Sequence, residues 1–111
     1  MEPKRRIIIK LSGEALAGTD NMAIDPLQVR EIAKEIKSAY DLGDLEIGII
    51  VGGGNIWRVK TAQAMGMERS SADYMGMIAT IMNALALQNA LEGLGLETRT
   101  MTSLNIPQVA E

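Results

Sequence analysis

The stretch EIGIIVGGG at residues 46–54 decides the fold class, because an apolar, β-branched run passes directly into three glycines. A second run, RIIIKL at residues 6–11, is followed by Ser12-Gly13-Glu14. Its core, Ile7-Ile8-Ile9, is apolar on both faces, which is typical of a central strand in a parallel sheet. We therefore expect strands at 6–11 and 46–51, each ending in a turn that contains glycine.

The segment between these strands predicts a helix. Asp25 is a suitable N-cap, Pro26 suits the first helical position, and Gln28 is placed for a capping box. Gly43 is the expected stop at the C-terminal end. One apolar face follows from residues at helical spacing, namely Val29, Ile32, Ala33, Ile36 and Tyr40.

A second helix is expected from Ser70-Ser71 to Leu91, with apolar residues on nearly all sides. Such a helix is covered on more than one side, and we expect its outer side, including Ile81, to form a subunit interface. After it, Glu97–Thr102 alternates as a third strand. The order β-α-β-α-β predicts an α/β fold with parallel strands, present as an incomplete half of a larger sheet.

Composition narrows the functional classes. The chain has 111 residues, of which 47% are hydrophobic, so it can form a core and is not a disordered chain. It has no Cys and no His, which excludes thiolate or imidazole chemistry. The formal net charge of −3 argues against a nucleic-acid binder, and Lys4-Arg5-Arg6 reads as the solvated flank of a strand.

No targeting segment is apparent, since the apolar run Ile7-Ile8-Ile9 is too short for a signal peptide. The segment Tyr74–Leu91 carries no charge, yet it contains Thr80, Asn83 and other amide side chains. A buried or interface helix is therefore favoured over a membrane span. We expect a cytoplasmic protein.

The glycine-containing turns are the candidate site. Ligands of open α/β sheets bind at the carboxyl ends of the strands, and glycines let backbone N–H groups approach phosphate oxygens. Lys10 ends an apolar strand, where it can stabilise a transferring phosphoryl group or simply extend into solvent. Three glycines can likewise form a plain turn, but two such turns side by side favour a phosphate site.

Three further side chains have two interpretations each. Arg58 either binds a phosphate or is a surface arginine. Trp57 either covers a ligand or, as we favour, packs beside the glycine turn. Asp73 is expected in the first turn of its helix, where the helix dipole alone would account for it.

The residues so far discussed form part of a longer resemblance. KLSGEAL (10–16), GGGNIWR (52–58), GMER (66–69), ADYMGMIAT (72–80) and MNALALQ (82–88) occur in the order and at the spacing of the bacterial UMP kinases. The glycine turn by itself resembles the wider amino-acid-kinase superfamily, which includes acetylglutamate, aspartate and carbamate kinases. The segment 72–88 narrows the resemblance to UMP kinases.

The resemblance implies an αβα sandwich and transfer of the ATP γ-phosphate to UMP, with Mg²⁺ accompanying ATP and no metal held by the residues named here. It implies roles for eight residues: Lys10 in catalysis; Lys10, Leu11, Ser12, Gly13, Gly54 and Arg58 in ATP binding; Gly53 and Asp73 in UMP binding. For Asp73 it replaces the dipole interpretation. The implied loop for the activator GTP is Gly18, Thr19, Asp20, Asn21, Met22 and Ala23.

The resemblance also implies a homohexamer built from dimers, inhibited by UTP. The family's second half has no counterpart here, so we expect residues 1–111 to be the N-terminal part of one domain, incomplete and inactive alone. Two alternatives stay open. One is a non-catalytic nucleotide-binding or assembly module built from the same half-domain, and the other is an amino-acid kinase that forms an acylphosphate.

Overall fold

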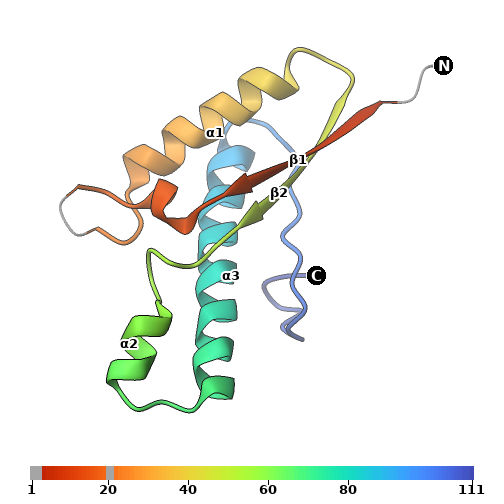
Figure 1. The fold of residues 1–111 in the computed structure, drawn as a ribbon. Helices are drawn as coiled ribbons and strands as arrows, with labels where there is room; N and C mark the ends of the chain where they lie inside the picture. Colours follow the sequence, from red (N-terminus) through yellow and green to blue (C-terminus); the bar gives the residue numbers. More distant parts are fainter. Residues whose placement is uncertain (1–3, 20–21) are drawn as a thin grey trace.

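The computed structural model describes residues 4–19 and 22–111. Within them the chain forms, in order, β1 (Arg5–Leu11), the short 3-10 helix η1 (Gly13–Leu16), α1 (Pro26–Tyr40), β2 (Leu45–Val51), α2 (Val59–Ala64) and α3 (Arg69–Gly93) (Figure 1). β1 and β2 are parallel, with Arg5 opposite Leu45 and Leu11 opposite Val51. The predicted α/β class with parallel strands is confirmed.

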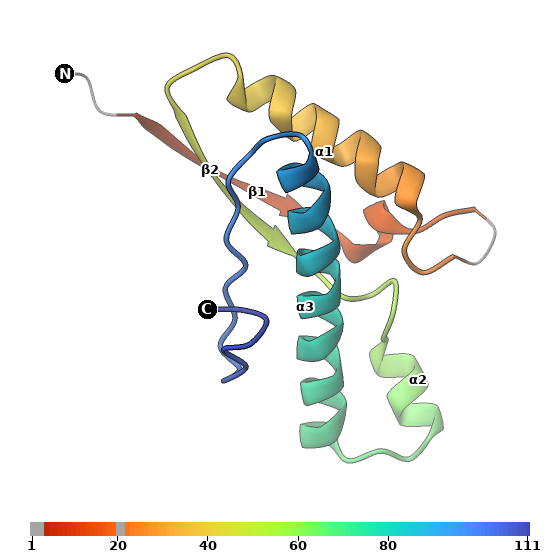
Figure 2. The ribbon, with the colours of Figure 1, turned by 180° about the vertical axis from the view of Figure 1, so that it is seen from behind.

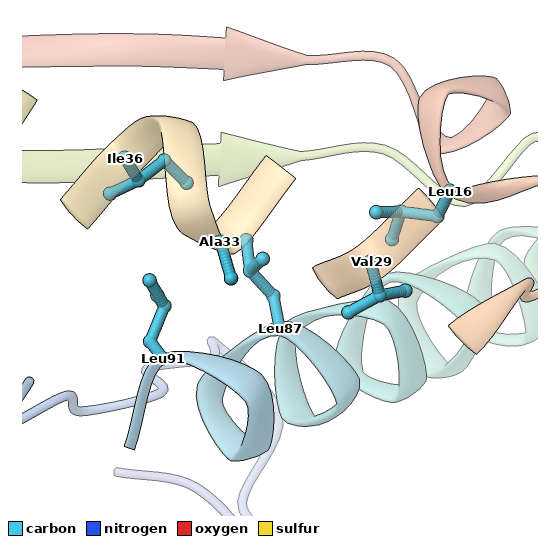
Figure 3. Close-up of a cluster of buried hydrophobic side chains, with 6 residues drawn as sticks. All are labelled: Leu16, Val29, Ala33, Ile36, Leu87 and Leu91. Atoms are coloured by element: carbon cyan, nitrogen blue, oxygen red, sulfur yellow. The ribbon is translucent and has the colours of Figure 1, made fainter. Parts of the chain in front are cut away.

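Both long helices lie against one face of the two-stranded sheet (Figures 1 and 2). Between them lies a core to which α1 contributes the apolar face predicted from its spacing, and Figure 3 shows these side chains pointing toward one another. The core cluster consists of Leu16, Val29, Ala33, Ile36, Leu87 and Leu91. Inward residues of the strands, including Leu11 and Ile49, pack against it.

The opposite face of the sheet is bare. Ile8 is 71% exposed and Ile50 is 55% exposed, although the apolar sequence of both strands is typical of a sheet covered on two faces. The described residues thus form two layers, a two-stranded sheet and the helices that cover one of its faces (Figure 1).

α1 begins as predicted. Asp25 Oδ1 accepts a hydrogen bond from the Leu27 N–H at 3.0 Å, and Pro26 is the first helical residue. Gln28 is exposed, and no capping-box bond from it is found among the described residues. After the helix, Gly43 has a φ of 94°, a conformation that favours glycine and ends the helical path.

α3 differs from the prediction in two respects. It begins at Arg69 after Glu68, so Ser70-Ser71 lies inside the first turn. Ile81 is only 6% exposed and is therefore covered within the chain, which makes the prediction of an open outer position wrong. The exposed apolar residues of α3, each 39–57% exposed, are instead Tyr74, Met75, Met77, Ile78 and Met82.

The predicted third strand at Glu97–Thr102 is wrong. The segment keeps the alternating burial of a strand, with Thr98 and Thr100 turned inward, but no ladder joins it to β2. A cavity of about 390 Å³ lies between β2, α3 and this segment. The backbone of the segment 97–102 pairs instead with Glu111, whose carbonyl accepts a hydrogen bond from the Thr102 N–H at 2.8 Å. Alternating burial can arise within a single segment, whereas a β-ladder also needs a neighbouring strand at hydrogen-bond distance.

Within the described residues, no helix combines the length and apolar character needed to cross a membrane.

Candidate functional site

The two strand ends meet at one edge of the sheet, as their glycines predict. The Gly52 N–H donates to the Leu11 carbonyl at 3.1 Å, which joins the turns that follow β1 and β2. A Cβ atom on Gly13 would lie 2.9 Å from the Gly52 carbonyl oxygen and 3.0 Å from the Gly54 nitrogen. Only glycine fits at position 13, because the backbones of the two turns touch there.

The segment after β1 presents polar groups at this edge. Lys10 is exposed on the bare face of the sheet, opposite Ile50, and no ion pair joins it to another residue in the described ranges. Ser12 Oγ accepts from the Glu14 N–H at 3.2 Å and caps η1. Leu11 packs inward against the core. Lys10 and Ser12 are thus accessible, while Leu11 and Gly13 shape the turn.

Arg58 forms an ion pair with Glu14, which links the segment after β2 to η1. Both side chains are more than half exposed, so water screens the pair and its contribution to stability is small. An anionic ligand at this edge would compete with Glu14 for the guanidinium. The structure therefore places Arg58 beside both turns rather than alone on the surface.

Gly53 lies against the middle of α3. A Cβ atom there would come 2.9 Å from Ala79 Cβ and 3.1 Å from the Thr80 nitrogen. Glycine at this position lets the turn and the helix approach each other closely, whatever ligand binds.

An open hollow of about 800 Å³ lies between the turn after β2, α2 and α3. Gly53, Gly54 and Asp73 line it together, so the structure brings these three predicted residues to one place. Lys10, Ser12 and Gly13 do not line it, although Gly13 touches the glycine turn from the segment after β1.

Asp73 is the fifth residue of α3, so it lies beyond the first turn. The expected position next to the helix terminus is wrong, and the dipole interpretation loses its basis because that effect is confined to the first turn. Asp73 is exposed and accompanied in the hollow by Arg69, one helical turn earlier. Sequence reasoning missed Arg69 as a lining residue, although its spacing of four from Asp73 predicts a shared face.

Trp57 packs against α3, in line with the interpretation that we favoured, while a role in covering a ligand stays a prediction. Its indole N–H donates to the Ala72 carbonyl at 3.1 Å, which packs the ring against α3, and the ring also lines the hollow.

The predicted loop for GTP is described only in part, since Asp20 and Asn21 lie outside the described residues. The Gly18 N–H donates to the Met22 carbonyl at 2.8 Å, and the Ala23 carbonyl accepts from Asn55 Nδ2 at 2.7 Å. Gly18, Met22 and Ala23 therefore belong to a segment in contact with the glycine turn, while Thr19 is exposed. Asn55 and its partner Asn83 were also missed by sequence reasoning.

No group of three or more His, Cys, Asp or Glu side chains suited to a metal ion occurs in residues 4–19 and 22–111. Mg²⁺ is typically held through one or two carboxylates, waters and substrate phosphates. The described side chains do not fit a site that holds the ion by themselves.

Comparison with known proteins places this α/β chain in a family. The model of the amino acid kinase family matches residues 5–110, and the chain belongs to that family. Uridylate kinase from Limosilactobacillus reuteri (strain DSM 20016) is 55% identical over 107 residues, which are 96% of this chain and 44% of that protein. The chain thus spans less than half the length of this curated relative.

Two solved structures are similar over almost the whole chain. The UMP kinase from Ureaplasma parvum matches with a TM-score of 0.91 at 37% identity, covering 99% of this chain and 46% of the other. The UMP kinase from Bacillus anthracis matches with a TM-score of 0.89 at 41% identity, covering 99% and 45%.

Proposed function

We propose that this chain provides part of the active site of a UMP kinase, which transfers the γ-phosphate of ATP to UMP and gives UDP. The observation that carries the proposal is the contact between two glycine turns at one sheet edge, beside a hollow that Gly53, Gly54 and Asp73 line. Backbone N–H groups at such turns suit phosphate, and a carboxylate suits ribose hydroxyls. The names of the relatives support the same reaction.

In the proposed reaction an oxygen of the UMP phosphate attacks the γ-phosphorus of ATP. A new P–O bond forms as the bond to the β-phosphate oxygen breaks, and ADP leaves. Lys10 stabilises negative charge on the transferring group, in the manner of a cation placed at a developing charge. Ser12, Gly13, Gly54 and Arg58 hold ATP, and Gly53 and Asp73 hold UMP.

ATP is the co-substrate, and its phosphates would supply the main ligands of an accompanying Mg²⁺, as is typical of this ion. We take residues 1–111 as the N-terminal part of a single amino-acid-kinase domain, and the remaining part of the fold supplies the rest of both nucleotide sites. A cytoplasmic location accords with free nucleotides as substrates.

The proposal extends to assembly and regulation. The exposed apolar side of α3 supports a homodimer contact, from which a hexamer is built. Activation by GTP through residues 18–23 and inhibition by UTP rest on the family resemblance alone.

The test is UDP formation from UMP and ATP by this chain within its full-length protein, with acetylglutamate and carbamate as competing acceptors. We expect turnover with UMP only. Nucleotide binding without turnover would support a non-catalytic module instead, and turnover with acetylglutamate or carbamate would support an acylphosphate-forming kinase. The chain of 111 residues alone is expected to be inactive.

A further inference from the structure

One amide side chain is fully buried in the described part of the chain. Asn83, in α3, has 0% of its surface exposed. Burial of an amide is unfavourable unless its donors and acceptor are satisfied, so the partners of Asn83 account for its position.

Asn83 is bonded to the glycine turn at two points. Its Nδ2 donates to the Gly52 carbonyl at 2.7 Å and to Asn55 Oδ1 at 2.7 Å. Asn55 Nδ2 donates in return to Asn83 Oδ1 at 3.0 Å. The first and last residues of the turn, Gly52 and Asn55, are therefore both tied to α3.

Asn55 also reaches two other segments. Its Nδ2 donates to the Ala23 carbonyl at 2.7 Å, in the segment that leads into α1. Its Oδ1 would lie 2.5 Å from a Cβ atom on Gly13, so the side chain fills the space beside η1. Asn55 thus contacts the surroundings of both glycine turns, while its backbone belongs to one of them.

We propose that Asn55 and Asn83 are positioning residues for phosphoryl transfer. Their reciprocal amide pair holds the turn 52–55 so that the Gly53 and Gly54 backbones keep a fixed position toward the phosphates. This inference rests on the proposed function. A displacement of the reacting groups by about 1 Å can cost roughly 10²-fold in rate, so the pair acts on catalysis without touching the substrate.

The test compares Asn55→Ala, Asn83→Ala and the double variant in the full-length protein. Asn89→Ala is the matched control, because Asn89 is an exposed asparagine of the same helix. With UMP and ATP saturating, at a temperature where every variant is folded, we expect kcat to fall by about tenfold or more in each single variant. The double variant should be little worse than the worse single one, because the two residues act as a unit.

A purely structural role predicts a different result. It would lower the thermal midpoint while kcat stays within about twofold of the wild type, and that result would overturn the inference. Asn83→Ala removes a buried hydrogen-bonding group and can fail to fold. Asn55→Ala then provides the test, since Asn55 is only half-buried.

A measurement without nucleotide separates this inference from the proposed function. The Ile56 and Trp57 N–H groups both donate to the Gly53 carbonyl at 3.0 Å and so report on the turn. In Asn55→Ala we expect their amide exchange to accelerate by about tenfold, while the amides of α1 are unchanged. Unchanged exchange would overturn the positioning role and leave the proposed function intact. A wild-type protein that makes no UDP would overturn the proposed function and, with it, the part of the pair in phosphoryl transfer, even if the exchange accelerates as expected.

Discussion

At the scale of single residues, the proposed reaction assigns to Lys10 the stabilisation of the transferring phosphoryl group. This lysine stands at the carboxyl end of β1, exposed and next to the turn that contains Ser12 and Gly13. In the full-length protein, Lys10→Ala should lower kcat by roughly 10²-fold or more, because a charge contact of the transition state is lost. Steady-state kinetics with UMP and ATP measure the effect, with Lys4→Ala as the control on the exposed strand flank. A kcat within about twofold of wild type would remove Lys10 from the chemistry.

A substitution of Asp73 tests the part of the proposed site that binds UMP. The Asp73 carboxylate lines the hollow, and if it accepts hydrogen bonds from the UMP ribose, Asp73→Asn should weaken UMP binding far more than ATP binding. Titration calorimetry with each nucleotide measures both affinities. Glu92→Gln, the same chemical change on an exposed residue of the same helix, should alter neither. Equal weakening of UMP and ATP would indicate general damage instead.

Among the elements, α3 carries apolar residues whose exposed fractions differ widely. Its N-terminal half extends beyond the sheet, and α2 packs beside it (Figure 1). Ile78 there is 48% exposed, whereas Ile81 is 6% exposed. Ile78 is therefore available to a second copy, whereas Ile81, about one turn further along α3, is covered within the chain although it is not a member of the core cluster.

This division gives a prediction with an internal control. In the full-length protein, Ile78→Glu should dissociate the oligomer while each subunit stays folded, because an unpaired charge buried in an interface is strongly unfavourable. Ile81→Glu should instead lower the thermal midpoint, since the same charge enters a position that is buried within the chain. Light scattering and thermal unfolding distinguish the two effects. An Ile78→Glu variant with unchanged mass would contradict the interface.

The elements that sequence predicts well are those whose signals are local. Asp25, Pro26 and the apolar spacing of α1 act within one helix, and β1 and β2 follow from their apolar runs. The prediction of a third strand is wrong because strand pairing depends on a neighbour that is distant in the sequence. The helix α2 was not predicted because its six residues are too few for a periodic signal. The prediction for Ile81 is wrong because α3 is apolar on nearly all sides, so spacing alone does not identify which of its residues the rest of the chain covers.

For the candidate site, too, some features could be predicted from the sequence, whereas others depend on contacts between distant segments. The meeting of the two glycine turns follows from the rule that parallel strands end at one edge. The hollow depends on α2, and the burial of Asn83 depends on a turn about 30 residues away, which no local pattern specifies. Sequence therefore predicted that the two glycine turns meet at one edge but not the amide pair behind them.

At the scale of the whole molecule, the chain is elongated. Its radius of gyration is 15.4 Å, against about 13 Å expected for a compact domain of this length. The bare sheet face, with Ile8 and Ile50, contributes an apolar surface that the described residues leave uncovered.

We therefore expect residues 1–111 in isolation to self-associate and to bind a hydrophobic dye. Sedimentation velocity across a range of concentrations measures the association. Ile8→Lys together with Ile50→Lys should reduce both the association and the dye signal. A chain that stays monomeric at high concentration without binding dye would show that this face is stable in water.

The position of Trp57 allows binding in the hollow to be followed by tryptophan fluorescence. It is the only tryptophan in the chain, and its ring both packs on α3 and lines the hollow. A nucleotide that enters the hollow would displace water from the indole, and the emission maximum should move to shorter wavelength. Fluorescence then follows occupancy in real time without a label, and in Asp73→Asn the midpoint of the signal should move to higher UMP concentration.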